Sequence, residues 1–245
     1  MNYFLVRDDA LPGNPPAWLL WSLPLAGVLS VVPLWWLWRS AYWGITGEDR
    51  VAEWLTFLAY LVICGLSAVI AVRLLQRGQP VDAALYALLA VGALFVAGEE
   101  VNWFQRQLEF AGPEAIVERN EQGVANVHNL LRPDALHATF VVVALYASLL
   151  ARWFVPRLPV LRVRPWLYVP PNSLAMWFAC TWIYFGLVYL ERVLDLLFGS
   201  TVTIEDLAGP TLQEVTELAL AGGFLLFVLR ILNGGVDDGS SRHSR

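Results

Sequence analysis

Long apolar stretches alternate with short polar segments along the whole chain. Crossing the hydrocarbon core of a bilayer takes about 20 mostly apolar residues in a helix. The stretches that meet this requirement cover residues 17–38, 51–72, 81–104, 135–155, 174–197 and 211–232. Asp82, Asp134 and Thr211 each stand just before an apolar run, where helix N-caps are expected. The pattern predicts an all-α integral membrane protein, a bundle of about six transmembrane helices.

One transmembrane domain over residues 17–232 accounts for this pattern, because no internal repeat divides it. The lead-in, residues 1–16, is acidic and rich in proline, unlike the basic start of a cleaved signal peptide. The first helix is therefore expected to be retained. The polar tail, residues 233–245, is predicted to be disordered.

Composition agrees with a membrane protein. Hydrophobic residues make up 58% of the chain and charged residues 15%, whereas soluble proteins carry about 25% charged residues. The formal net charge of -5 argues against a nucleic-acid partner, which would require a basic surface. Cys64 and Cys180 lie inside apolar runs, so they are expected to pack as small hydrophobic residues.

The arginines are distributed unevenly between the two predicted sides of the membrane. All 16 basic residues are arginine, and the segment "RWFVPRLPVLRVR", residues 152–164, carries four of them on the side that also holds the N-terminus. Cytoplasmic loops carry an excess of Lys and Arg. The distribution therefore predicts that both termini are cytoplasmic.

Acidic residues and a histidine collect at the opposite end of the predicted helices. The residues concerned are Glu53, Glu99, Glu100, His137, Glu191, Asp195, Glu214 and Glu217. Ionisable groups at membrane level are expensive, and they usually face a bundle interior or a water-filled cavity. A polar cavity on the non-cytoplasmic side is therefore the leading hypothesis.

The stretch "GEEVNWFQRQ", residues 98–107, ends the third apolar run and is its most unusual part. At about 100° per residue of a continuous helix, Glu99, Asn102, Trp103 and Arg106 would share one face, with Glu100 and Gln107 beside it. Val101, Phe104 and Leu108 would take the opposite face, towards lipid or an apolar neighbour. A functional site is one interpretation; an ion pair of Glu99 with Arg106 that anchors the helix end is the other.

The connection that follows is longer than most helix–helix connections, and such loops are usually functional or disordered. Regularly placed apolar residues predict two short amphipathic helices between the third and fourth spans, lying on the membrane as a lid over the cavity. His128 would then lie near Glu99 and Glu100, although a lone loop histidine is more often a solvated surface residue. The other polar residues assigned to the cavity are Gln105, Gln122, Asn126 and Asn129.

The remaining candidates have structural alternatives. Thr211 and Glu214 have the spacing of a capping box, whereas Glu217 lies one turn deeper and has no such explanation. Glu191 and Asp195 would repel each other as an i, i+4 pair, unless Arg192, a cation or interfacial water relieves them. His137 is equally consistent with a hydrogen-bonded structural role.

Three segments, "GEDRVAEWLTFLAYL", "AGEEVNWFQRQLEF" and "NEQGVANVHNLL", resemble a group of uncharacterised multi-pass bacterial membrane proteins. The pattern of that group is similar to G-E-E-[IV]-x-W-x-Q-R followed by N-x-Q-x-E-x-N-x-H-N. The matching residues are Glu99, Glu100, Trp103, Gln105, Arg106, Gln122, Asn126, His128 and Asn129. Val124 stands where the pattern has Glu. The resemblance implies family membership and a bacterial inner (cytoplasmic) membrane, but no activity.

Three functions remain open. In the first, a membrane-embedded hydrolase or transferase acts on a lipid or lipid-linked substrate. Glu99 or Glu100 would be its general base, and Arg106 would stabilise negative charge. Glu100, His128 and His137 could also bind a divalent metal such as Zn, Mn or Fe. The second is a non-catalytic assembly or binding protein. The third is a proton- or cation-coupled transporter. The scarcity of acidic residues towards the cytoplasmic side argues against it, because a path through the membrane should not be polar at one end only.

Overall fold

The computed structural model describes residues 16–109, 112, 133–159, 161–199 and 203–234, and every regular element in these ranges is a helix. Six helical stretches in the described ranges are long and apolar enough to cross a membrane. They cover Ala17–Leu37, Arg39–Gln76, Pro80–Glu100, Ala135–Arg157, Pro165–Phe198 and Leu212–Asn233. The predicted all-α, six-helix membrane fold is confirmed.

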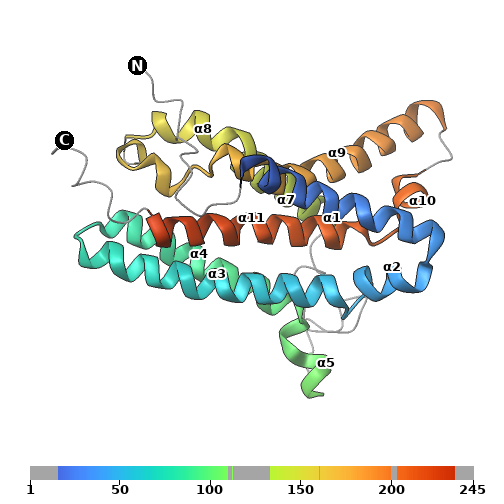
Figure 1. Ribbon diagram of the computed structural model, residues 1–245, viewed down its shortest axis with the longest axis horizontal. Coiled ribbons are helices and arrows are strands. Elements are labelled where there is room, and N and C mark those ends of the chain that lie inside the picture. The colour runs from blue at the N-terminus through green and yellow to red at the C-terminus, as the bar shows by residue number, and fades with distance from the viewer. Residues whose placement is uncertain (1–15, 110–111, 113–132, 160, 200–202, 235–245) are drawn as a thin grey trace. The chain divides into compact units, whose positions relative to one another are not determined.

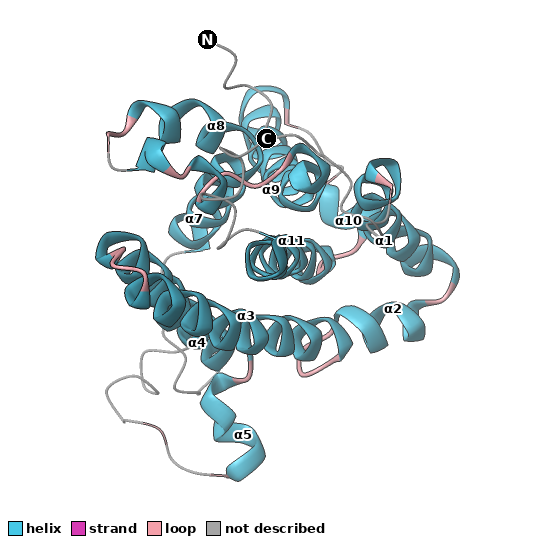
Figure 2. Cartoon of the chain, turned by 60° about the vertical axis from the view of Figure 1, so that its left-hand side comes forward, coloured by secondary structure: helices cyan, strands magenta, loops and turns pink. Residues whose placement is uncertain are grey.

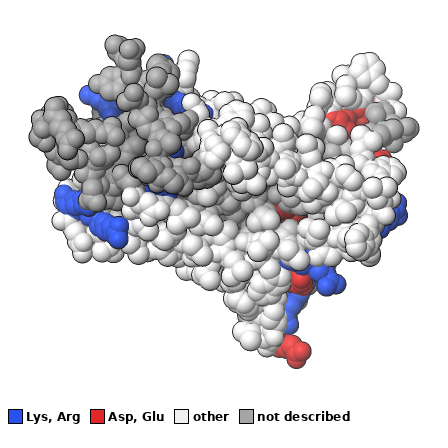
Figure 3. Space-filling view, viewed as in Figure 1, with Lys and Arg blue, Asp and Glu red and all other residues white. Residues whose placement is uncertain are grey.

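The surface of these helices fits a lipid environment. Helix α3 (Val51–Gln76) leaves Leu55, Leu58 and Leu61 between 43% and 49% exposed, which would be unfavourable in water. Most of the described surface visible in Figure 3 is uncharged. The chain is therefore a multi-pass membrane protein.

The chain divides into two compact units, which are described separately. The first unit comprises Met1–Ala52 and Phe140–Phe227, and the second comprises Glu53–Thr139 and Val228–Arg245. The single transmembrane domain expected from the sequence stays a prediction.

In the first unit, α1 (Ala17–Leu37) and α9 (Ala175–Phe198) lie side by side (Figure 1). Trp177 of α9 donates its indole N–H to the Leu20 carbonyl, at 2.9 Å. A buried cluster holds the unit together. Its members are Val31, Tyr42, Tyr184, Phe185, Leu212 and Val215. They come from α1, α9, α11 (Leu212–Gly234) and the short helix α2 (Arg39–Thr46). Segments distant in sequence thus share one core.

Two short helices of the first unit were not predicted. Helix α2 follows α1 after a turn at Trp38 (Figure 2). Helix α10 (Ile204–Ala208) begins with a capping box, in which the Thr203 hydroxyl accepts from the Asp206 N–H and the Asp206 carboxylate accepts from the Thr203 N–H. The backbone N–H and then the hydroxyl of Thr203 hold the pKa of the Asp206 carboxyl below its ordinary value. Trp35 and Trp36 donate to the Asp206 and Leu207 carbonyls.

The predicted fourth span is not one uniform α-helix. Helix α7 (Pro133–Leu145) passes into a π-helical turn, Tyr146–Leu150, before α8 (Ala151–Phe154). The buried Ser148 hydroxyl donates to the Ala144 carbonyl at 2.7 Å and accepts from the Trp182 indole at 3.1 Å. These bonds satisfy a polar group inside an apolar span.

In the second unit, α4 (Pro80–Glu100) begins with Pro80 at its first position, where a missing N–H costs nothing. Asp82 lies within its first turn rather than at the N-cap, which is Gln79. A short helix, α5 (Gln105–Leu108), follows and points away from α3 and α4 (Figures 1 and 2). The segment between α4 and α5 is the candidate site.

A candidate functional site at the end of helix α4

The backbone after α4 makes a left-handed turn of three non-glycine residues. The φ angles of Asn102, Trp103 and Phe104 are 49°, 53° and 61°. Residues other than glycine each lose roughly 1–2 kcal/mol in this region, so a run of three is unusual. The continuous helix predicted up to Phe104 is wrong, because α4 ends at Glu100. The shared helical face inferred for Glu99, Asn102, Trp103 and Arg106 is wrong for the same reason.

Three contacts of Trp103 hold this turn in place. Its indole N–H donates to the Glu99 carboxylate at 2.6 Å. Its ring packs against Phe95 with centroids 5.9 Å apart. It also lies directly over Gly98, where a Cβ atom would approach the ring carbons Cε3 and Cζ3 to 2.7 Å. Only a glycine at position 98 therefore leaves room for the Trp103 ring to pack this closely against the helix backbone.

Phe104, the last residue of the turn, packs against helix α3. Its ring lies edge-on to Phe57, with centroids 5.5 Å apart, and 6.5 Å from the ring of Trp54. Aromatic contacts of this kind each contribute about 0.5–1.5 kcal/mol beyond the area that they bury. They help to offset the conformational cost of the left-handed backbone.

The turn buries polar groups that a regular helix would have distributed differently. Glu99 is 4% exposed, Asn102 6% and Gln105 8%. Val101, predicted to face lipid or an apolar neighbour, is also buried, at 2%. The neighbouring Glu100 and Arg106 are half-buried. A carboxylate, two amides, a second carboxylate and a guanidinium therefore come from eight consecutive residues at the end of one membrane helix.

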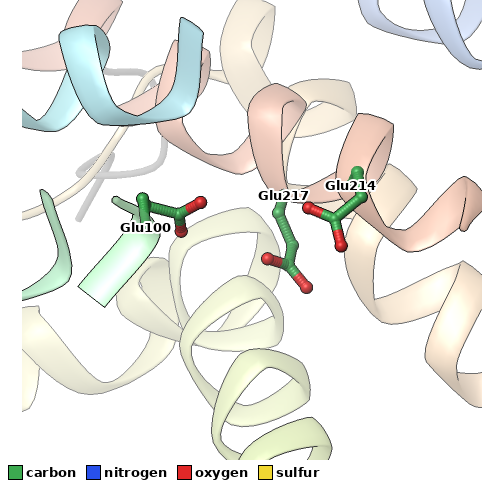
Figure 4. Close-up of side chains that lie close together, drawn as sticks. All are labelled: Glu100, Glu214 and Glu217. Atoms are coloured by element: carbon green, nitrogen blue, oxygen red, sulfur yellow. The ribbon is translucent and has the colours of Figure 1, made fainter. Parts of the chain in front are cut away.

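The two adjacent carboxylates have different environments. Glu99 is buried and accepts the Trp103 indole N–H, so it takes part in holding the turn. Glu100 is half-buried in the last turn of α4 (Figure 4). The more accessible Glu100 is therefore the better candidate for exchanging a proton with a substrate or for binding a cation.

We expect Trp103→Phe to lower the free energy of unfolding by about 1.5–3 kcal/mol, the range for a hydrogen bond to a charged group. Phenylalanine keeps an aromatic ring in the seat over Gly98 but removes the donor to Glu99. Unfolding by sodium dodecyl sulfate in mixed micelles, followed by circular dichroism, measures the difference. Trp18→Phe, at a position 69% exposed, is the matched control and should change stability by about 0.5 kcal/mol or less. Equal losses in both variants would contradict this role of Trp103.

Helix α11 carries two more of the predicted carboxylates. Glu214 and Glu217 are half-buried and project from its first turns (Figure 4). Three residues apart, they lie on the same side of the helix and could supply two oxygen ligands to a divalent cation. The Thr211 hydroxyl lies 2.6 Å from that of Thr46 and 3.3 Å from that of Tyr42. A capping box is formed at Thr203 and Asp206, and the one predicted at Thr211 and Glu214 stays a prediction.

The other predicted residues are placed as follows. The Glu191 carboxylate accepts from the Ile204 N–H at 2.6 Å, which gives it a structural role at the start of α10. Asp195 is exposed on α9, and His137 is half-buried in α7. Gln122, Asn126, His128, Asn129 and the predicted lid lie outside the described residues.

Sequence reasoning missed two features that shape these regions. Tyr42 is fully buried and accepts the Thr211 N–H at 3.1 Å, which ties α2 to the start of α11. Gly98, next to the acid pair, was part of the motif but had no assigned role. A glycine preceding polar residues at a helix end was the available signal for close backbone approach.

Comparisons with protein-family models, with curated proteins and with solved structures gave no match to this chain. The candidate site is therefore defined by its own geometry: a left-handed turn, fixed by Trp103, that buries polar side chains at the end of a membrane helix.

Proposed function

We propose that the chain is a membrane-embedded hydrolase or transferase that acts on a lipid or lipid-linked substrate. The observation that carries this proposal is the left-handed turn at residues 102–104, with the buried polar groups around it. Strained backbone persists only where the surrounding structure imposes it, and it clusters at active sites and ligand clamps. Ionisable groups at membrane level are functional candidates by default.

Four residues in or beside the turn have a role in this proposal. Glu100 is the general base that activates water or a substrate hydroxyl, and Arg106 stabilises the negative charge that develops. Glu99 and Trp103 are positioning residues that fix the turn. A divalent metal (Zn, Mn or Fe) held by Glu100, His128 and His137 would supply the nucleophilic water instead.

The expected membrane topology assigns the candidate site to one side of the membrane. If the six helices cross the bilayer in alternating directions, then the end of α4 and the starts of α7 and α11 share one side. With both termini cytoplasmic in a bacterial inner membrane, as the arginine distribution favours, that side is periplasmic.

The second candidate is a non-catalytic binding or assembly protein. The Glu99–Trp103 hydrogen bond favours it, because it uses one of the two acids for structure. In that case the turn would present a rigid surface to a partner rather than a reactive group to a substrate.

A turnover experiment separates the two candidates. Native protein is reconstituted into vesicles of phosphatidylethanolamine and phosphatidylglycerol, its metal content is measured by elemental mass spectrometry, and released fatty acid, diacylglycerol and headgroup are followed by mass spectrometry. Glu100→Gln is the test variant, and Glu205→Gln, at an exposed position on α10, is the matched control.

We expect turnover by the native and Glu205→Gln proteins, and a decrease of about 100-fold or more in Glu100→Gln, as for loss of a general base. About one equivalent of metal, absent from Glu100→Gln, would favour the metal-assisted form. No product from the native protein, or equal product from both variants, would overturn the role of Glu100 and favour the binding protein.

A further inference from the structure

The segment that joins α8 to α9 in the first unit is described at residues 155–159 and 161–174. These residues contain four short 3-10 turns, Val155–Arg157, Leu161–Val163, Pro165–Leu167 and Asn172–Leu174. Ala151, Val155 and Val169 form a buried cluster beneath it, with Leu161 and Tyr168 packed against them. The segment is therefore anchored to the membrane helices by its own apolar side.

This segment is basic and has no acidic residue near it in the sequence. Arg152, Arg157, Arg162 and Arg164 lie within it, and residues 135–190 contain no Asp or Glu. Arg157 and Arg162 are exposed. No neighbour within this stretch can neutralise their charge.

Two of the arginines are held in fixed orientations. Arg152 donates to the carbonyls of Ser148 and Pro170. Arg157 donates to the Trp153 carbonyl and stacks over the Trp153 ring, with its guanidinium carbon 4.3 Å from the ring centroid. A guanidinium has five N–H donors in a planar fork that suits phosphate oxygens. Fixing its orientation in advance lowers the entropic cost of binding an anion.

Large apolar side chains are exposed on the same short segment. Trp153 is 59% exposed, Phe154 49%, Leu158 46% and Val163 63%. Arginines beside exposed aromatic and aliphatic side chains are typical of surfaces that lie in the headgroup region of a bilayer. The position of Arg157 in the chain agrees with a headgroup location, because Arg157 is the last residue of an apolar helical stretch that is long enough to cross a membrane.

We propose that the described residues 152–159 and 161–164 bind the anionic headgroups of phospholipids, with Arg157 and Arg162 as the principal contacts. The negatively charged lipid of a membrane leaflet supplies a countercharge for Arg157 and Arg162, which have no acidic residue near them in the sequence. The contact would attach the first unit to anionic lipid at the end of the fourth span. The inference rests on the membrane fold and is independent of any catalytic activity.

The test is lipid binding by detergent-solubilised protein, measured by native mass spectrometry with dioleoyl phosphatidylglycerol and dioleoyl phosphatidylcholine in competition. The test variant is Arg157→Gln/Arg162→Gln. The control, Arg50→Gln/Arg192→Gln, removes two other exposed arginines. Arg157→Lys/Arg162→Lys retains the charge, and the thermal unfolding midpoint of each variant reports whether it is folded.

We expect native protein to prefer phosphatidylglycerol, and to lose this preference as salt is raised. Each arginine removed from the test pair should weaken phosphatidylglycerol binding about fivefold, while the control pair keeps most of it. The lysine pair keeps the charge but not the planar fork of donors, so its binding should fall between those of the glutamine pair and the native protein. Equal binding of the two lipids by native protein, or an equal loss in the control pair, would overturn the proposal. If the glutamine pair does not fold, the single variants Arg157→Gln and Arg162→Gln replace it, and unchanged phosphatidylglycerol binding by both would overturn the proposal.

Discussion

Gly98→Ala is expected to destabilise the second unit by about 1–3 kcal/mol, the usual cost of overpacking a well-filled site. The new Cβ would lie 2.7 Å from two ring carbons of Trp103, so the ring must move away from its position over residue 98. The indole hydrogen bond to Glu99 would then be lost and the left-handed turn left without its main support. Unfolding in mixed micelles measures the energy, and hydrogen exchange measures the opening of the amides of residues 101–109.

Gly92→Ala is the matched control for this prediction. Gly92 lies in the same helix, and a Cβ there would meet nothing within 4 Å. Alanine has the higher helix propensity by about 1 kcal/mol, so this variant should be neutral or slightly more stable. If Gly98→Ala behaved like Gly92→Ala, the close contact with Trp103 would not be needed for stability.

Gly209→Ala is expected to have the larger effect, a loss of more than about 3 kcal/mol or failure of the first unit to fold. Gly209 has φ 91° and ψ 151°, a region that is essentially restricted to glycine. A Cβ there would also overlap the hydroxyl oxygen of the fully buried Tyr42. Backbone strain and a steric clash therefore act together. The yield of folded protein and its thermal unfolding midpoint measure the effect.

Gly199→Ala separates these two causes. Gly199 ends α9 in the left-handed helical region, with φ 64° and ψ 43°, and a Cβ there would meet nothing within 4 Å. Alanine should cost only the conformational strain, about 1–2 kcal/mol. Similar losses at both glycines would show that contact with Tyr42 adds nothing.

The membrane helices could be predicted from the sequence because the bilayer itself enforces them. A chain segment in hydrocarbon must satisfy its backbone hydrogen bonds internally, so apolar length is a sufficient signal. Helices α2 and α10 lack that signal. Their place depends on bonds between residues far apart in sequence, such as those from Trp36 to Leu207 and from the Thr211 amide to Tyr42.

The sequence predicted where the candidate site lies, but not the backbone conformation of that stretch. The acid pair inside a membrane helix predicted a polar site at residues 98–107. Left-handed backbone is signalled by Gly, Asn or Asp, and in the turn only Asn102 carries that signal. Trp103 and Phe104 carry no such signal and fit a continuous helix equally well, so the turn results from side-chain packing that the sequence pattern does not reveal. The roles predicted for His128 and for Gln122, Asn126 and Asn129 stay predictions.

The bonds between α1 and α10 have a consequence for biosynthesis. The Trp35 and Trp36 indoles each find their acceptor 171 residues later in the chain. At a synthesis rate of about 5–20 residues per second, roughly 10–30 seconds pass before that acceptor exists. During this interval the nascent first helix must be held by lipid or by the insertion machinery. The hydrogen bonds between α1 and α10 can form only after residues 206 and 207 have emerged from the ribosome.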